Sequence, residues 1–439
     1  MMKNPSFDIT TRNLIFNQKN LTLTYLNSLS EATMISELVK GVNAGGTIID
    51  VSLANGSVEE NNDIDALQKA LYSGCAIIEY ENRSYIVDTR SYPSSSIQQP
   101  ETEKTVRGSK DGFNENIIVN VGLIRRRIRD TNLVMELHTV GKVSKCDVCV
   151  SYLSNKVNQD LLQSVINRLQ SITIDDLSMS DRALEELFIK QGYHPFPFVR
   201  YCERPDIVAT QIMKGYIAII VDTSSSVILL PVTLFELLEH VEEHRQNPIV
   251  GSMLRLIRLF GVMISVYLIP IWLVIIKTPE LEWYILKNPT KNLDYGDIVL
   301  QIIILEFAIE LLRVATIHTP SALSNSISLV SALLLGEIAV GIGIFLEEVL
   351  LYGAISTLAS FATPNYELSL ANKLVKWLLI IAIMCFNQYG FVVMNFLLFI
   401  YLANLKVFNK EYLYPFVPFD DTKFLEHLIR KPKKENSSN

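Results

Sequence analysis

The chain has 439 residues and a formal net charge of −7 at neutral pH. With about 150 residues in a typical domain, this length leaves room for about three domains. A surface that binds nucleic acid needs clustered lysine and arginine, so the acidic balance argues against a nucleic-acid partner.

The first half of the chain contains two runs of elements in the same order. The first run is a strand, two helices and a hairpin, expected at residues 21–26, 31–41, 65–74 and 75–88. The second run repeats them at residues 147–153, 158–169, 206–215 and 216–230. Tyr25 and Tyr152 occupy equivalent places, and Gly74 and Gly215 each suit the left-handed position at which helices often end. The repeated order predicts two similar α/β subdomains.

We place the first subdomain at residues 1–91 and the second at residues 113–250. The segment 92–112 between them is rich in proline, serine and glycine, which is typical of a linker. The polar N-terminus lacks the apolar stretch that a cleaved signal peptide carries. We therefore expect this soluble half to stay in the cytoplasm.

No catalytic or metal-binding motif stands out. The sequence contains no nucleophile elbow, P-loop, HExxH or dinucleotide-binding fingerprint, so we expect no enzyme activity. Cys146 and Cys149 form a CxxC sequence, but zinc needs four ligands and no second pair lies at a suitable spacing. His240 and His244 stand four residues apart, a spacing that exposed, charge-rich helices often carry by chance. We expect no bound metal and no cofactor.

The chain changes character near residue 253. The run 259–276 carries no charged residue, and about 18 uncharged, mostly apolar residues suffice for a spanning helix. With this run included, the hydrophobic segments are expected at residues 253–276, 298–316, 323–340, 344–361 and 374–405. The last is longer than one crossing requires, so it must tilt, protrude or break near Asn387. We expect an all-α polytopic membrane domain at 251–405 and a cytoplasmic tail at 406–439.

Basic residues flank both ends of this domain. Arg255 and Arg258 stand at its start, and Lys406 and Lys410 follow its end, so the positive-inside rule places both ends in the cytoplasm. Two ends on one side require an even number of crossings, and the weak third segment would then be re-entrant. The two lysines at the start of the fifth segment fit this topology poorly.

Charged and polar side chains interrupt the second and third hydrophobic segments. Glu306, Glu310 and Arg313 lie on one face of the expected helix, so Arg313 can pair with Glu310 and leave Glu306 as surplus charge. The polar residues of the third segment include Ser324, Asn325, Ser328 and Glu337. One interpretation is an internal salt bridge beside a packing seam of small residues. We favour the other, a polar lining for a water-filled ion pathway whose surplus acid favours cations.

Four arginines lie within five residues of one another, at positions Arg125, Arg126, Arg127 and Arg129. Like charges this close repel one another and need acidic partners. We expect these arginines to form an inter-domain or inter-subunit contact that serves assembly. A solvated basic face is the alternative interpretation.

Four segments of the chain resemble one known family. They are ETEKTVRGSKDGF at 101–113, LIRRRIRD at 123–130, the YHPFP and ERPD sequences within 193–206, and LEFAIELLR at 305–313. All four are similar to segments of spore germination receptor A subunits, the GerA-type family. Residues 241–248 and the span after them resemble the stage V sporulation protein AF branch. Ser109 stands where the family usually has proline.

The resemblance implies a function that composition and spacing do not show. It implies a multi-pass protein of the spore inner membrane whose soluble domain faces the spore core. Such a protein would assemble as a homo-oligomeric channel and release monovalent cations early in germination. It would act beside other germination membrane proteins, including a small membrane partner. The alternative is a non-conducting scaffold or signal-transmitting subunit of a germination receptor or of a dipicolinate-release complex.

Overall fold

The computed structural model describes most of the chain, in two compact units. The residues outside the description are 1–5, 45–56, 93–99, 101–102, 104, 106, 176, 178–179, 190–191, 279–285, 287–288, 290–292, 319–338, 409 and 433–439. The first unit, here called the sheet unit, comprises Met1–His194, Phe198–Val232 and Lys406–Lys410. The second, the helical unit, comprises Pro195–Pro197, Thr233–Leu405 and Glu411–Asn439.

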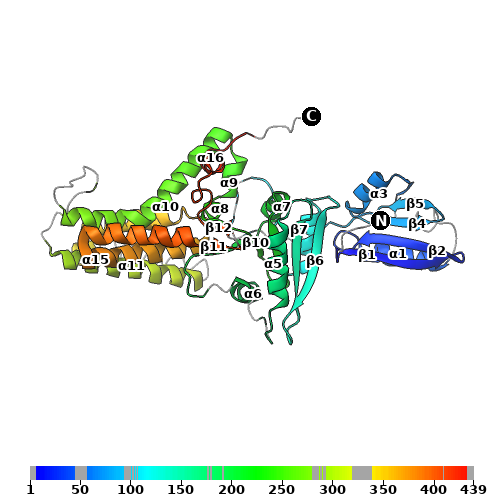
Figure 1. The fold of residues 1–439 in the computed structure, drawn as a ribbon, viewed down its shortest axis with the longest axis horizontal. Coiled ribbons are helices and arrows are strands. Elements are labelled where there is room, and N and C mark those ends of the chain that lie inside the picture. Colours follow the sequence, from blue (N-terminus) through cyan, green and yellow to red (C-terminus); the bar gives the residue numbers. More distant parts are fainter. Residues whose placement is uncertain are drawn as a thin grey trace. The chain divides into compact units, whose positions relative to one another are not determined.

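The first subdomain of the sheet unit is a five-stranded antiparallel sheet with helices (Figure 1). Its strands are β1 Ile9–Phe16, β2 Lys19–Leu26, β3 Val58–Glu60, β4 Ala76–Tyr80 and β5 Arg83–Val87, and its helices include α1 Ala32–Ala44 and α3 Ile64–Leu71. The strand order is β1-β2-β4-β5-β3. Leu21, Leu23 and Tyr25 of β2 alternate with half-buried threonines, because neighbouring side chains of a strand point to opposite faces. The buried set packs against Ile35 and Leu38 of α1.

The second subdomain repeats this architecture. Its strands are β6 Leu133–Val140, β7 Cys146–Leu153, β8 Arg200–Cys202, β9 Ile217–Val221 and β10 Val227–Leu230, and its helices are α4 Ile117–Arg125, α5 Gln159–Gln170, α6 Ser180–Ile189 and α7 Pro205–Met213. The order β6-β7-β9-β10-β8 matches the first sheet strand for strand. Tyr25 and Tyr152 are each the seventh residue of their strand. The expected pair of similar subdomains is confirmed, whereas the boundaries that we assigned to them stay a prediction.

Two glycines show how closely the repeats correspond. Gly74 and Gly215 follow the equivalent helices α3 and α7 and have φ angles of +96° and +97°. A Cβ atom would lie 2.9 Å from the carbonyl oxygen of Leu29 at Gly74, and 2.7 Å from that of Lys156 at Gly215. Leu29 and Lys156 each stand three positions beyond the end of the equivalent strands β2 and β7. The same left-handed turn and the same close approach therefore require glycine in both repeats.

The two subdomains differ in what covers the second face of the sheet. In the second subdomain α4 packs against α7 and β9. Among the described residues of the first subdomain, the equivalent place beside α3 and β4 is a cavity of about 250 Å³. Thr11, Thr22, Thr24, Ile77 and Glu79 line its sheet side. The first sheet therefore presents a polar face where the second buries an apolar one.

The helical unit is a bundle whose helices pack lengthwise (Figure 1). Its elements are α8 Leu234–Leu237, α9 Val241–Arg245, α10 Pro248–Lys277, α11 Tyr295–His318, α13 Ala339–Gly341, α14 Glu347–Ser360, α15 Tyr366–Asn404 and α16 Asp421–Leu428. Two short strands, β11 Lys406–Val407 and β12 Lys410–Glu411, follow α15 and pair with each other, and β11 belongs to the sheet unit. Trp272 and Leu273 of α10, Val349 of α14 and Ile383 of α15 belong to the core of the bundle.

Two helices of the described chain, α10 and α15, are long and apolar enough to cross a membrane. Only 39% of the apolar window of α10, and 22% of that of α15, is buried within the chain. The core helix of a soluble protein buries most of its apolar surface, so these exposures favour a membrane environment. The expected fold class, a soluble α/β half followed by a helical membrane region, holds with these two candidate spans.

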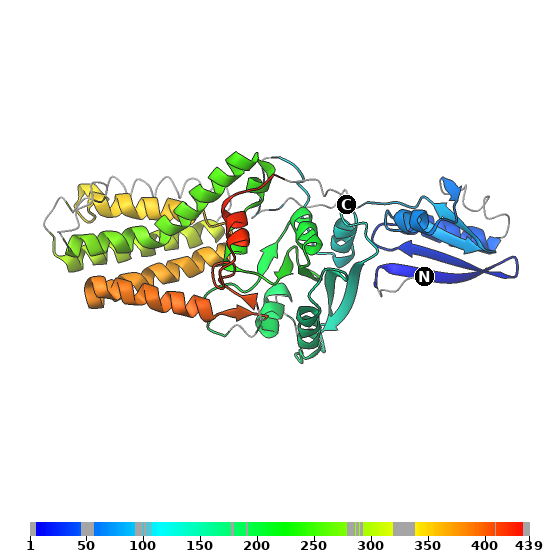
Figure 2. The same ribbon diagram turned by 45° about the horizontal axis from the view of Figure 1, so that its top comes forward.

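The long helix α15 is interrupted at Asn387, whose φ of 55° and ψ of −141° are not helical. A Cβ atom on Gly390 would lie 2.0 Å from the carbonyl oxygen of Ala382. Residues eight apart in an unbroken helix are separated by about 12 Å, so the chain doubles back at Asn387 (Figure 2). The expected break is therefore present, and α15 forms two antiparallel arms. The expected re-entrant segment at 323–340 lies almost entirely outside the described residues.

Candidate functional site

A buried ion pair joins α11 to α15 in the middle of the bundle. The Nζ atom of Lys376 lies 2.7 Å from Oε1 of Glu306. The two residues are 2% and 7% exposed. Each ionised group at the centre of a lone membrane helix costs roughly 2.5–3.5 kcal/mol on insertion scales, and pairing offsets that cost. The pairing therefore allows two charged side chains to stay buried in the interior of the helical unit.

The same lysine extends the network to two further helices. Lys376 also donates to Oγ of Ser356 on α14 at 3.2 Å. Ser356 in turn donates to the backbone oxygen of Ser265 on α10 at 3.0 Å. Both serines are buried. One ammonium group and one hydroxyl thus connect α10, α11, α14 and α15.

A second, less buried cluster lies one turn further along α11. Glu310 contacts Nζ of Lys373 on α15, and its other oxygen lies 3.8 Å from Nη1 of Arg313. The guanidinium of Arg313 stacks over the ring of Tyr366, 5.2 Å from its centroid. The expected pairing of Glu310 with Arg313 exists, but Lys373 is the nearer partner.

The expected surplus of acid is wrong for the described residues. Glu306 is paired with Lys376, and the two carboxylates at Glu306 and Glu310 face three cations at Lys373, Lys376 and Arg313. The prediction of surplus acid was wrong because it considered only the spacing of residues along one helix. The two lysines belong to α15, some seventy positions away in sequence, and folding alone brings them to α11.

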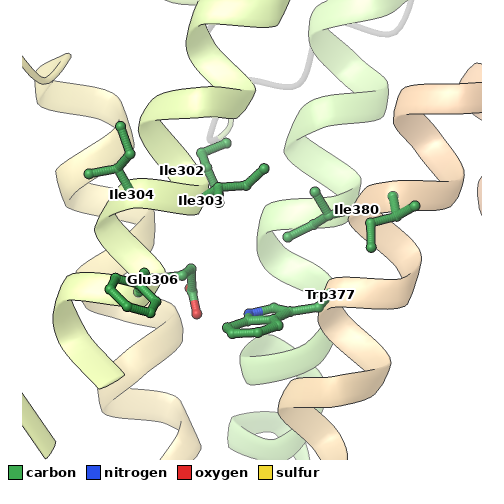
Figure 3. Close-up of a pocket in the computed structure, with 8 residues that line it drawn as sticks. Ile302, Ile303, Ile304, Glu306, Trp377 and Ile380 are labelled. Atoms are coloured by element: carbon green, nitrogen blue, oxygen red, sulfur yellow. The ribbon is translucent and has the colours of Figure 1, made fainter. Parts of the chain in front are cut away.

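An apolar cavity, rather than a polar lining, borders Glu306 (Figure 3). It has a volume of about 340 Å³ and lies between α11 and α15. Apart from Glu306 its walls are Ile302, Ile303, Ile304, Phe307, Trp377, Ile380 and Ile381. The expected polar lining is therefore not formed around Glu306. The reason is the sequence of α11, which places isoleucines and phenylalanine on both sides of the carboxylate.

Four of the expected pathway residues, Ser324, Asn325, Ser328 and Glu337, lie outside the described residues. The structure brings Glu306 and Glu310 together with the lysines of α15. Their place on an ion pathway stays a prediction. Sequence reasoning missed Lys373 and Lys376 as partners, although their position within a hydrophobic run was a usable signal.

Arg125 makes a fully buried ion pair in the sheet unit. Its Nε and Nη2 atoms donate to the two oxygens of Asp8 at 2.9 and 3.0 Å. Its Nη1 donates to the backbone oxygen of Leu133 at 2.9 Å, and Nη2 donates also to Oγ of Ser6 at 2.6 Å. Arg125 and Asp8 are both fully buried. The pair joins α4 of the second subdomain to the chain just before β1 of the first.

The other three arginines of this cluster are more exposed than Arg125. Arg126 stacks 5.0 Å from the ring centroid of Tyr92, and Arg127 contacts Asp111. Arg129 lies 3.4 Å from Oγ of Ser73. Through Tyr92 and Ser73, Arg126 and Arg129 reach the end of the first subdomain. The role of the four arginines in assembly stays a prediction.

Two of the sequence segments that carried the family resemblance meet in the sheet unit. Arg200 donates to Glu103 at 2.9 Å, and Arg204 donates to the backbone oxygens of Glu103 and Ser109 at 3.2 and 2.9 Å. The thiol of Cys202 lies 3.0 Å from the same Glu103 carboxylate. Burial raises the pKa of Cys202 well above its usual range, so the thiol keeps its proton and donates a hydrogen bond to Oε2 of Glu103. These residues fasten the linker to the second sheet.

Within the described parts of the chain, no group of three or more histidine, cysteine, aspartate or glutamate residues is placed to hold a metal ion. Cys149 is buried on β7, and burial raises its pKa well above the usual range of a thiol. His240 accepts a hydrogen bond from the backbone N–H of Glu242 at 3.2 Å, and His244 faces Glu239.

Comparison with known proteins identifies the family. The family model of the Bacillus/Clostridium GerA spore germination protein matches residues 1–439. The chain belongs to the GerA family. It is 40% identical to stage V sporulation protein AF of Bacillus subtilis, over 98% of this chain and 90% of that protein. It is 28% identical to spore germination protein KA of the same organism, over 92% of this chain and 75% of that protein.

One solved structure also matches part of this GerA-family chain. It is the crystal structure of the N-terminal domain of the A subunit of the Bacillus megaterium spore germinant receptor GerK3, 25% identical in sequence, with a TM-score of 0.39. The match covers 51% of this chain and 88% of that one. Membership of the GerA family confirms the resemblance seen in the sequence and supports a role in spore germination.

Proposed function

We propose that the chain is a membrane subunit of the spore germination machinery that assembles as a homo-oligomeric channel and releases monovalent cations. It would lie in the spore inner membrane, with the sheet unit facing the spore core, beside other germination membrane proteins and a small membrane partner. The observation that carries this proposal is the Glu306–Lys376 pair, 2.7 Å apart and almost fully buried between two apolar helices. Family membership and the two candidate spans supply its setting.

The geometry gives the pair a specific role in the proposed channel. Ionisable groups within membrane segments commonly mark ion routes, because their burial is otherwise costly. The ammonium group of Lys376 occupies the place beside Glu306 that a permeating monovalent cation would take. The arrangement described here is then the closed state, and opening requires Lys376 to leave Glu306. The adjoining cavity between α11 and α15 leaves open space beside the Glu306 carboxylate.

A non-conducting scaffold is the second candidate, and one observation favours it. Glu306 and Glu310 are both paired, and the network through Ser356 ties four helices together. A static bundle needs nothing more. A scaffold tolerates loss of the pair as a whole, whereas a channel needs the Glu306 carboxylate itself.

Cation flux from liposomes separates these candidates. The purified full chain is reconstituted, its oligomeric state is measured by light scattering, and release of K⁺ is followed for the parent and for Glu306→Gln. The matched control is Asp297→Asn, which removes an exposed carboxylate from the first turn of the same helix. The channel proposal expects flux in the parent and in the control, and at least about a tenfold loss in Glu306→Gln, by analogy with filter carboxylates. A monomeric parent, or equal flux in all three, contradicts it.

A further inference from the structure

Helix α10 begins, and helix α15 ends, at the same end of the helical unit. Lys277, the last residue of α10, contacts Asn387, where α15 doubles back. The second arm of α15, residues 388–404, then returns along α10, because the rings of Tyr267 and Phe391 lie 6.3 Å apart. With both helices crossing a membrane, one membrane surface lies at this end of the unit.

The C-terminal segment 412–431, here called the tail, contacts both helices at that end. Its helix α16 lies beside the start of α10 (Figure 1), where Arg255 donates to two backbone oxygens of α16. The ring of Phe416 lies 6.3 Å from that of Phe399, five residues before the end of α15. The tail is therefore at the level of the expected membrane surface.

The tail carries exposed apolar side chains. Four of them are between 44% and 66% exposed: Phe416, Phe419, Leu425 and Ile429. Phe424 holds α16 on α8, with its ring 5.8 Å from that of Phe235. Leu425 and Ile429 stand four residues apart on an adjoining side of the same helix, and the described residues leave that side open. An exposed, continuous apolar surface of this kind marks a contact with a protein or a membrane.

Basic groups directly follow this apolar surface. The backbone N–H of Arg430 donates to Oγ of Ser252 on α10 at 2.9 Å, which fixes the chain at this point. The Nη1 atom of Arg430 is buried, and it has no hydrogen-bond partner among the described residues. Lys431 is 62% exposed, and the sequence continues with lysines at 433 and 434. A guanidinium nitrogen without an acceptor, beside a run of positive charge, fits a phosphate group.

We propose that the tail lies on the membrane surface and binds anionic lipids. Its exposed apolar side chains enter the boundary between headgroups and acyl chains, and Arg430 and Lys431 contact lipid phosphates. An apolar helix face beside basic residues is the pattern of a helix that lies in the plane of an anionic bilayer. A protein partner would explain the apolar side chains, but not their level beside the ends of α10 and α15.

This inference rests on the part of the proposed function that places α10 and α15 across a membrane, and not on conduction. Cation flux and the position of the tail are measured separately. A chain that carries no flux can still hold its tail on lipid, and a conducting chain can hold it in water. Failure of one proposal is therefore distinguishable from failure of the other.

Electron paramagnetic resonance of a spin-labelled full chain in lipid nanodiscs tests where the tail lies. Cys146→Ser and Cys385→Ser first remove the two thiols that are not fully buried. A label at Leu425→Cys should be reached by dissolved oxygen, which concentrates among acyl chains, and not by a water-soluble nickel chelate. The matched control is Lys423→Cys, which places the label on the opposite side of the same helix and should give the reverse.

Both other outcomes at position 425 refute the proposal. A label that neither probe reaches is covered by protein, from a second copy or another chain. A label that the nickel chelate reaches as readily as it reaches position 423 faces water. Size-exclusion chromatography first shows that each labelled chain is folded.

A second measurement varies the lipid and leaves the sequence of the parent intact. Amide hydrogen-exchange protection of residues 421–428 is compared between nanodiscs of phosphatidylcholine and nanodiscs of equal parts phosphatidylcholine and phosphatidylglycerol. We expect at least about tenfold more protection in the anionic discs, because each basic residue near such a surface contributes about fivefold. Helix α5 of the sheet unit is the internal reference for global stability.

A pair of double variants assigns this difference to the tail. Arg430→Gln/Lys431→Gln should lose most of the added protection. The control Lys19→Gln/Arg83→Gln removes two exposed cations from the sheet unit and should keep it. Equal protection of α16 in both kinds of disc, or a tail variant that responds to lipid as the parent does, overturns the assignment of Arg430 and Lys431 to lipid phosphates.

Discussion

Two buried ion pairs, one in each unit, differ in how completely their atoms are satisfied. In the sheet unit all three guanidinium nitrogens of Arg125 donate hydrogen bonds, and Asp8 accepts from Ser6 and Ser28 as well. In the helical unit Lys376 donates to Glu306 and Ser356, and an apolar cavity borders the carboxylate. All three nitrogens of the Arg125 guanidinium are hydrogen-bonded, whereas Lys376 is a single flexible chain whose partner, Glu306, borders a cavity.

This difference separates a structural charge from a candidate functional one. The Arg125–Asp8 pair has a full set of hydrogen bonds, so neither side chain gains by changing partner. Its role is to fix the two subdomains on each other. A lysine has a compact charge on a flexible stem and exchanges partners more readily than an arginine. Burial alone would have ranked the two pairs as equals. The two ion pairs are distinguished by the number of hydrogen-bond partners and by the presence of a cavity beside one of them.

The largest effect is expected at Asp8. Asp8→Asn keeps the shape of the side chain but leaves the buried guanidinium of Arg125 without its counter-charge, which typically costs about 3–5 kcal/mol. Thermal unfolding of the full chain, followed by circular dichroism of its strands, measures the loss. The control Asp88→Asn removes the half-buried partner of the exposed Arg90 and should cost less than about 1 kcal/mol. Equal losses would mean that Arg125 and Asp8 do not fix the two subdomains.

A smaller loss is expected at Lys376. Lys376→Met strands Glu306 among apolar side chains, at a cost of about 2.5–3.5 kcal/mol, that of one unpaired charge in a membrane helix. The double variant Glu306→Gln/Lys376→Met should recover most of this loss, because it removes both charges. Thermostability of the detergent-solubilised chain, read by size-exclusion chromatography, measures both. A double variant as unstable as the single one would contradict the pairing.

At Glu310 the expected effect is smaller again. Its partners Lys373 and Arg313 are 16% and 17% exposed and Glu310 is 28% exposed, so this cluster is less buried than the Glu306–Lys376 pair. Replacing Arg313 by Met should cost less than about 1 kcal/mol, because Lys373 still pairs with Glu310. The same thermostability assay applies. A loss as large as that of Lys376→Met would show that Arg313, and not Lys373, holds Glu310.

The smallest effect on stability is expected for Arg126 and Arg127. Replacing both with alanine removes a stacking contact and an ion pair that are partly solvated, at about 1 kcal/mol or less in total. If these arginines serve assembly, oligomer size measured by light scattering falls while the monomer stays folded. Unchanged oligomer size and protein level would leave only a solvated basic face.

Much of the fold could be predicted from the sequence, because it depends on local patterns. Gly74 and Gly215 indicated two equivalent helix ends. In the hairpins that follow them, apolar and polar residues alternate, or apolar residues are continuous, as is typical of strands. The strand β1 was missed because its exposed, polar residues give little periodicity. The strand β6 was missed because its first three residues, 133–135, are all buried and so break the alternation of a strand. Helix α4 was missed because it is buried on nearly every side and so lacks an amphipathic face.

The sequence predicted one residue of each ion pair in the candidate site but not its partner. Glu306 and Glu310 stood out because carboxylates are rare in a hydrophobic run, and Arg125 stood out within a basic run. Their partners did not, since Lys376 lies seventy residues beyond Glu306 and Asp8 lies more than a hundred residues before Arg125. Spacing within one helix suggested a surplus of acid that tertiary packing removes. Long-range pairing is the part of a charge site that a single sequence does not display.

Cation flux in a charge-pair series tests the role of Glu306 most directly. K⁺ release from liposomes is compared among the parent, Glu306→Gln, Lys376→Met and the double variant, each shown to be folded by size-exclusion chromatography. If Lys376 occupies a cation site at Glu306, Lys376→Met raises flux, Glu306→Gln lowers it, and the double variant stays low. If the four proteins carry equal flux, or none carries any, Glu306 and Lys376 are only a structural pair and the chain does not conduct through them.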